Sequence, residues 1–243
     1  MVLYMDVLNL TSRKRETYKV LLDYSVLWEC ALGIAAITNT PIINTLDQPL
    51  DYWDDIKSSL SKELLDHLDY VERNNTWKAL LQLLHKKRFS DLSEFESYIM
   101  DVPDNDLKFI CLPFIGMEFQ DIRYKAALGE ESALNEMKVL TSDNPFYPRY
   151  IEFIGRSDIK HLKRHLIGVM NGWYKTVIKK DSYKFNTILR TDYETKKEML
   201  EKLTPEELVE WATGGVIYLP EPSVNDVLLI PQYIYRPWNI EAD

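Results

Sequence analysis

The chain has 243 residues, 46% of them apolar, and its 29 Lys and Arg against 38 Asp and Glu give a formal charge of −9. This length and apolar content predict a globular protein with a sizeable core, organised as one domain or one and a half. The 8 Gly and 11 Pro are too few for a disordered or collagenous chain. The acidic balance argues against general nucleic-acid binding, because phosphate contacts need clustered Lys and Arg.

The sequence also indicates a compartment. The first residues lack the basic region and cleavage site of a signal peptide, and no apolar run approaches the roughly 18 residues that a membrane span requires. Cys30 and Cys111 both lie in apolar runs, which is typical of reduced core cysteines. We therefore expect a cytoplasmic protein without a membrane segment.

The N-terminal third combines strand and helix patterns. Residues 1–10 and 17–24 are rich in Val, Leu and Tyr and predict two short strands, or one strand with an extended lead-in. Apolar residues then recur at helical spacing over three segments, residues 24–38, 51–74 and 76–87. The first of these is apolar enough to be a buried helix, and the other two are amphipathic.

Local signals place helix ends in the middle of the chain. Asp91 followed by Glu94 resembles a capping box and opens a helix that continues to Met100. Pro113 is expected to interrupt the apolar stretch around it, and Gly129 is expected to terminate a helix.

Further helices follow. Their spacing predicts residues 131–140, a long helix over 157–180 capped by Ser157, and a charged helix over 193–203. Thr204-Pro205-Glu206-Glu207 then combines an N-cap, a first-position Pro and a Glu three residues on, and Gly214 is expected to end that helix.

The last part of the chain is β-rich. Residues 216–220 and 227–238 are two β-competent runs separated by turn-forming residues, which predicts a hairpin. We therefore expect one domain over residues 1–243 of the α+β class, mainly α with a small antiparallel β-sheet formed by the N- and C-terminal segments.

Signatures of common enzymes are missing from the sequence. It contains no Gly-x-Ser-x-Gly elbow, phosphate-binding loop or dinucleotide fingerprint, so we expect neither an enzyme nor a cofactor. His161 and His165 lie four residues apart on one predicted helix face and could offer two imidazoles to a metal. The basic residues between them oppose this and no third ligand is identifiable, so we expect no metal. A small metal-dependent enzyme using this pair is the alternative.

One charge asymmetry stands out. Residues 156–190 hold nine Lys or Arg and two Asp, a net charge of +7 that leaves −16 for the rest. This segment is either an anion-binding or partner-docking face or the solvated side of helices that face acidic neighbours. The residues of such a face would be Lys160, Lys163, Arg164, Lys179 and Lys180.

The C-terminal segment carries a resemblance to a known family. It contains Trp211-Ala212-Thr213-Gly214-Gly215 and then Val227-Leu228-Leu229-Ile230-Pro231-Gln232-Tyr233 running into Arg236-Pro237-Trp238. This resembles the N-terminal domain of Bacillus-type ArsR-like winged-helix transcriptional regulators, in which such a strand leads toward a C-terminal helix-turn-helix. The metal-sensing cysteine motifs of better-known ArsR members are absent from this sequence.

The resemblance implies a regulatory domain that senses an effector, dimerises or does both. It also implies a winged helix after residue 243, so the present residues would contact DNA only through that further domain. A homodimer and a small-molecule effector would be its partners. Aromatic and basic residues are the candidate ligand contacts, with core packing as their alternative role: Trp28, Trp173, Tyr174, Tyr233, Tyr235 and Arg236. A pure protein-interaction domain is the remaining alternative.

Overall fold

The computed structural model describes residues 18–220 and 224–240, and the strand predicted over residues 1–10 lies outside them. The chain divides into two compact units. We call residues 24–192 with 230–240 the helical unit, and residues 18–23 with 193–229 the small unit. The described chain is mainly helical, as predicted. Within the described ranges, no helix has both the length and the apolar character needed to cross a bilayer.

The core of the helical unit is built around α1 (Val26–Ile37). Ser25 caps this helix by accepting a hydrogen bond from the Leu27 N–H at 3.2 Å. Every residue from Leu27 to Ile37 is buried, as expected for a helix that is apolar on all sides. Helices α5 (Trp77–Lys86) and α11 (Ile159–Trp173) pack against it. The predicted helices over residues 24–38 and 76–87 are confirmed.

The prediction of one continuous helix over residues 51–74 is wrong, because the structure has two helices in this segment. Two helices, α3 (Leu50–Ser59) and α4 (Lys62–Asn74), are separated by extended backbone at Leu60. Ser61 starts the second by accepting the Leu64 N–H, a local bond that competes with a continuous helix. The short helix α2 (Thr40–Ile43) precedes them.

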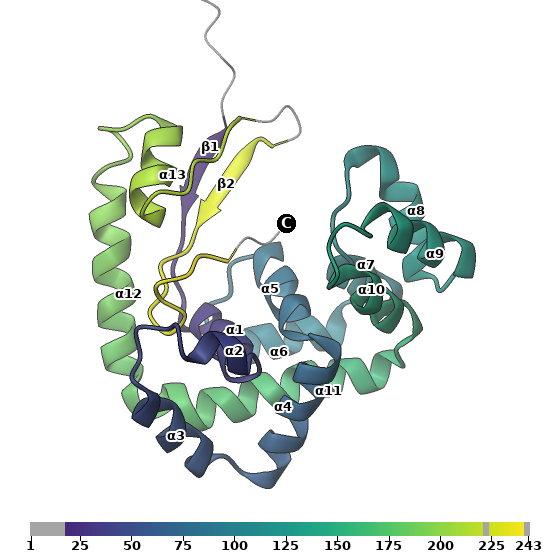
Figure 1. Cartoon of the computed structure of the whole chain (residues 1–243), viewed down its shortest axis with the longest axis horizontal. Helices are drawn as coiled ribbons and strands as arrows, with labels where there is room; N and C mark the ends of the chain where they lie inside the picture. The colour runs from purple at the N-terminus through teal and green to yellow at the C-terminus, as the bar shows by residue number, and fades with distance from the viewer. Residues whose placement is uncertain (1–17, 221–223, 241–243) are drawn as a thin grey trace, which may run out of the picture. The chain divides into compact units, whose positions relative to one another are not determined.

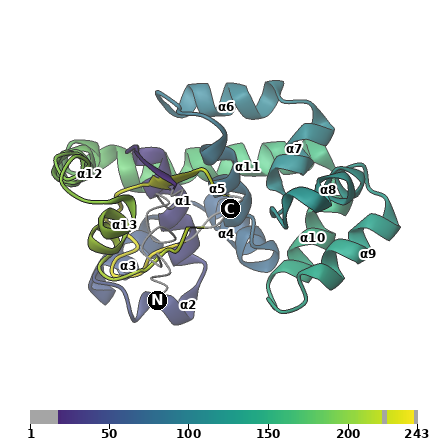
Figure 2. The same ribbon diagram turned by 90° about the horizontal axis from the view of Figure 1, so that it is seen from above.

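Helices of the middle segment gather at one end of α11 (Figures 1 and 2). One of these helices ends at Ala127 and is followed by Gly129, at φ +85°, as predicted. Another ends at Cys111, before Pro113, which is also as predicted. The predicted helix over residues 131–140 is confirmed. The helices are α7 (Asp104–Cys111), α8 (Gln120–Ala127), α9 (Glu131–Leu140) and α10 (Tyr147–Arg156), and α6 (Leu92–Asp101) precedes them.

The long helix after α10 differs from its prediction at both ends. Asp158, not Ser157, caps α11 by accepting the His161 N–H at 2.7 Å, while the Ser157 hydroxyl donates back to the Phe153 carbonyl. A π-helical turn (Tyr174–Ile178) and a 3-10 turn (Lys179–Asp181) then end it. The next helix, α12 (Ser182–Lys197), begins eleven residues before the helix predicted over 193–203.

The small unit contains the clearest predicted helix start. Helix α13 (Pro205–Thr213) has the full capping box: the Thr204 hydroxyl accepts the Glu207 N–H, and the Glu207 carboxylate accepts the Thr204 N–H. Gly214, at φ +73°, ends it as predicted.

The direction of the small sheet corrects a prediction. Strands β1 (Lys19–Leu22) and β2 (Asp226–Leu229) pair in parallel with Val20 opposite Val227, not antiparallel (Figure 1). Residues 216–220 form no strand, so the predicted hairpin is wrong. A tight turn forces neighbouring strands to be antiparallel, whereas these two are joined through the helices, and such a crossover permits the parallel direction.

Candidate functional site

The strongest candidate site is a buried carboxylate on α1. Glu29 is fully buried in a helix whose other core residues are apolar. It lies in the first turn, where negative charge is favoured by the helix dipole. A charged side chain is seldom buried without hydrogen-bond partners, because burying an unpaired charge is costly.

Both oxygens of Glu29 are bound by a segment distant in sequence. The backbone N–H of Tyr233 donates to Oε1 at 2.6 Å, and that of Ile234 donates to Oε2 at 3.0 Å. Residues 230–238, which we call the strap, directly follow β2 and belong to the helical unit. One side chain therefore fastens two consecutive peptide groups of the strap to α1.

The strap is held in a compact turn by its own side chains. Gln232 accepts the Tyr235 N–H through Oε1 and donates to the Trp238 carbonyl through Nε2. At its far end the Arg236 carbonyl accepts the Asp47 N–H at 2.8 Å. Ile234 and Tyr235 are buried, so the strap adds apolar contacts to the polar ones.

Burial governs the protonation of this site. It raises the pKa of Glu29 from 4.5 to about 7, although the two backbone N–H donors act in the opposite direction. It also raises the pKa of the neighbouring Tyr52 on α3, and the charge of Glu29 adds to that increase. Glu29 therefore exchanges its proton near neutral pH.

The structure places some predicted ligand residues at this site. Tyr233 lies in the strap, its ring against Phe185 with the Lys184 ammonium 5.3 Å from the ring centre. Tyr235 is buried in the strap, whereas Arg236 is exposed and 3.7 Å from a carboxylate oxygen of Asp47.

The remaining predicted ligand residues belong to the core or its edge. Trp173 is fully buried, and its indole occupies the space beside Gly33, one turn after Glu29 on α1. Trp28 is buried on α1, and Tyr174 is half-buried in the π-helical turn. Sequence reasoning missed Glu29 itself, although an acidic residue inside the apolar run VLWECALGI was a usable signal.

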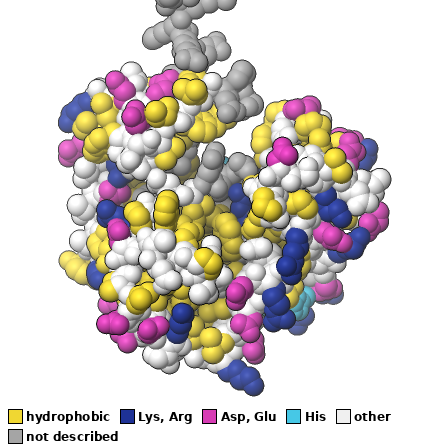
Figure 3. All heavy atoms as spheres, in the orientation of Figure 1, with side chains coloured by type: hydrophobic (Ala, Val, Ile, Leu, Met, Phe, Trp, Pro, Cys, Tyr) yellow, Lys and Arg dark blue, Asp and Glu magenta, His cyan; other side chains and the backbone are white. Residues whose placement is uncertain are grey.

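The predicted anion-binding residues form two groups rather than one face: Lys160, Lys163 and Arg164 lie at the start of α11, and Lys179 and Lys180 lie beyond its other end. Lys163 is buried and donates to the carbonyls of Met100 and Val102, with Asp104 3.1 Å away. The Arg164 guanidinium donates to the Lys160 carbonyl. Lys179 and Lys180 follow the opposite end of α11, whose 15 residues span about 22 Å. On the face in Figure 3, basic and acidic side chains are interspersed.

A second polar cluster joins α4, α5 and α11. The Nδ1 atoms of His67 and His165 are 3.1 Å apart, and Nε2 of His165 is 2.8 Å from the Thr76 hydroxyl. The Tyr70 ring packs on His165, with the ring centres 4.4 Å apart. One of the two Nδ1 atoms must donate and the other accept, so at least one of the two imidazoles is neutral. Burial lowers the pKa of His165 from 6.5 to about 3.

His161 and His165 are thus differently placed. His161 is exposed, whereas both ring nitrogens of His165 have partners within hydrogen-bond distance. In the ranges that the structure describes, no three His, Cys, Asp or Glu side chains are grouped as a metal site.

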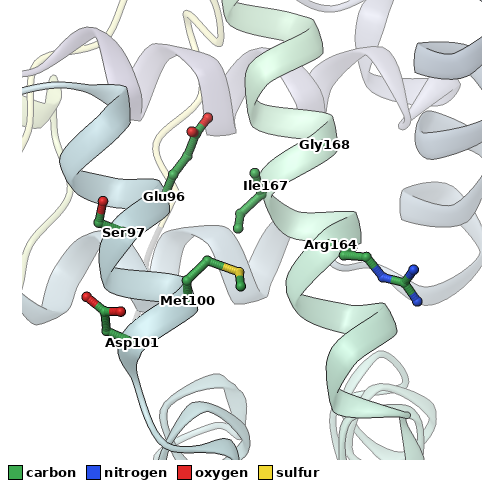
Figure 4. A pocket seen from close by; sticks show the side chains of 7 residues that line it. All are labelled: Glu96, Ser97, Met100, Asp101, Arg164, Ile167 and Gly168. Carbon is green, nitrogen blue, oxygen red and sulfur yellow. The ribbon is translucent and has the colours of Figure 1, made fainter.

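A shallow groove of 520 Å³ lies between α6 and α11. Glu96, Met100 and Asp101 line it from α6, and Arg164 and Ile167 line it from α11, as Figure 4 shows. The Arg164 side chain points away from α6, so it does not bridge to the two carboxylates. The groove offers no convergent polar groups comparable with those around Glu29.

Comparison with known proteins identifies no relative. No family model matches the chain, and neither a curated protein nor a solved structure matches it. The function must therefore be inferred from the residues and their geometry.

Proposed function

We propose that this chain is the regulatory part of an ArsR-like transcriptional regulator and does not itself bind DNA. It would sense a small-molecule effector, dimerise, or do both, in the cytoplasm. A two-fold dimer would suit the two half-sites of an operator. The winged helix would follow residue 243.

The observation that carries this proposal is the attachment of the strap to α1 through Glu29. The strap lies near the C-terminal end of the chain, and α1 is the central helix of the helical unit. An effector that rearranged α1 would therefore alter the element that leads toward the proposed winged helix. Such an effector must bind the two arrangements with different affinity, and operator binding must change effector affinity in return.

The proposal is tested on the gene and on DNA binding. We expect the reading frame to continue beyond codon 243 into a winged helix. The natural full-length protein should bind its operator duplex with an affinity that falls steeply with salt, while residues 1–243 should show no binding. Fluorescence anisotropy at several salt concentrations measures both. A stop codon at that point, or equal binding by residues 1–243, would contradict the proposal.

A metal measurement tests the enzymatic alternative. Elemental analysis of protein purified without added metal is expected to show no stoichiometric zinc, iron or manganese. A bound metal that disappears in His161→Ala would favour a metal-dependent enzyme over a regulator.

A further inference from the structure

The sheet of the small unit has two strands in the described part of the chain, so β1 has one edge that β2 does not cover. We propose that this free edge, together with the apolar surface beside it, is the docking site of residues 2–10 of the same chain, which would add a strand to the sheet. The docking involves neither DNA nor an effector, so it is independent of the proposed function.

The free edge of β1 follows from the direction of its peptide groups. The N–H groups of Lys19 and Asp23 donate to carbonyls at the two ends of β2, at 2.8 and 3.3 Å. Because successive peptide groups of a strand point to opposite edges, those of Val20 and Leu22 point away from β2. Among the described residues, β2 is the one strand that pairs with β1, so these groups have no ladder partner there. Such an edge is a template for another strand.

The faces of this sheet are also incompletely covered. Parallel sheets are normally buried on both faces, and two strands alone are marginally stable in water. Here the register places Leu21 opposite Leu228, so one face carries two leucines, and Leu21 is 47% exposed. The sheet therefore has the composition of a buried element and the exposure of a surface one, which indicates that further chain packs on it.

More apolar side chains lie beside the start of β1. Tyr18 is buried, its hydroxyl donates to the Tyr218 carbonyl at 2.9 Å, and the two rings are in contact. The residues on either side of Tyr218 are exposed, Ile217 by 67% and Leu219 by 61%. Apolar side chains that gather on one exposed surface typically mark a binding site.

The chain itself supplies an occupant that is tethered beside this surface. Residues 2–10 (VLYMDVLNL) are mostly apolar and β-competent, and seven residues, 11–17, connect them to Tyr18. Tyr18 is the first described residue and contacts Tyr218. The short connection therefore keeps residues 2–10 near the free edge, at an effective concentration that a separate chain does not reach.

The charge of the connection is complementary to this part of the small unit. Arg13-Lys14-Arg15 is a basic run just before Tyr18, whereas α13 begins with Glu206 and Glu207. Burial, followed by the charge of Glu206, raises the pKa of Tyr18, which places Glu206 near the start of β1. The acidic start of α13 therefore attracts the basic connection toward the sheet.

Amide exchange resolved to single residues by NMR tests the docking in the whole chain. The N–H of Leu21 lies in the ladder with β2 and should be protected in any case. Docking predicts that the N–H groups of Val20 and Leu22 are protected as well, because they would then donate to residues 2–10. Residues 205–213 of α13 serve as the reference for unfolding of the small unit.

A pair of double variants tests the occupant. Val7→Asp with Leu8→Asp changes adjacent residues, which point to opposite faces of a strand, so it should prevent docking by either face. Exchange of the two edge amides should then increase roughly tenfold, while residues 205–213 keep their protection. Thr11→Asp with Ser12→Asp adds the same charge in the connection and should leave the edge protected.

A second pair of variants tests the surface. Ile217→Ser removes an exposed apolar contact and should increase exchange at the free edge roughly fivefold. Val139→Ser is the matched control, because Val139 is 72% exposed but lies on α9 in the helical unit. It should leave exchange at the edge unchanged.

The docking is refuted if Val20 and Leu22 are unprotected in the wild type, or if their protection survives Val7→Asp with Leu8→Asp. Protection that falls on dilution, with a dimer in sedimentation equilibrium, would assign the edge to a second copy and would also refute it. Should the doubly substituted chain fail to fold, exchange in the wild type and in Ile217→Ser still decides the question.

Discussion

Two buried titratable residues in the helical unit replace their lost hydration in different ways. Glu29 receives two backbone N–H groups, whereas His165 is paired with a neutral hydroxyl and a second imidazole. The His165 cluster joins helices to one another, whereas the Glu29 carboxylate ties the backbone of the strap to the core. That difference is why Glu29, rather than the histidine pair, carries the proposed function.

A single glycine on α1 shows how closely this core is packed. A Cβ added at Gly33 would lie 2.7 Å from two atoms of the buried Trp173 indole, so the ring or the helix must move. Gly33→Ala should therefore lower the free energy of unfolding by about 2 kcal/mol, even after the better helix propensity of Ala is included. Urea denaturation followed by circular dichroism measures the loss.

Gly172→Ala is the matched control, because its added Cβ would meet the end of the flexible Leu64 side chain. We expect a smaller loss there. In a Trp173→Phe background the cost of Gly33→Ala should shrink, since the smaller ring relieves the clash. An unchanged cost would show that the indole is not the obstacle.

At the scale of elements, hydrogen bonds of the first helical turn decided where several helices begin. Ser61 divides a hydrophobic pattern that continues from α3 into α4, and Asp158 starts α11 one residue later than predicted. Periodicity alone does not detect such an interruption, because the apolar residues keep their spacing across it.

The capping box of α13 gives a prediction for the small unit. Thr204→Ala removes the hydroxyl that accepts the Glu207 N–H and should destabilise the helix by about 1 kcal/mol. Hydrogen exchange of residues 205–213 is the direct measurement. Thr187→Ala on α12 is the control, because that hydroxyl only donates to a carbonyl within its own helix. Equal effects of the two substitutions would argue against the cap.

At the scale of the whole molecule, two groups give stability an opposite dependence on pH. Burial lowers the pKa of His165 from 6.5 to about 3, so its contribution is complete above 6.5 and is lost as the pH falls toward 3. The pKa of Glu29 is raised from 4.5 to about 7, so its contribution is complete below 4.5 and is lost as the pH rises to 7. In the overlap, between pH 4.5 and 6.5, the two slopes cancel.

We therefore expect these two groups to produce a plateau of stability between pH 4.5 and 6.5. Denaturant midpoints from pH 3.5 to 8.5 measure it. Relative to the wild type, Glu29→Gln should flatten the decline around pH 7, and His165→Gln should flatten the decline on the acid side. Parallel profiles for the wild type and both variants would contradict these assignments.

Much of the helical architecture could be predicted from the sequence alone. Helical spacing and end signals located α1, α5, α9 and α13 because these depend on neighbours within a few residues. The parallel direction of β1 and β2 could not be predicted, because the strands lie at opposite ends of the chain and helices join them.

The candidate site, too, could be predicted from the sequence only in part. The sequence by itself determined that α1 is a buried helix and that residues 230–238 are rich in apolar and aromatic side chains. Only the tertiary structure decided that Glu29 and the peptide groups of Tyr233 and Ile234 meet. The physical reason is that backbone N–H groups are the same at almost every residue, so no side-chain pattern reveals which of them a buried carboxylate will bind.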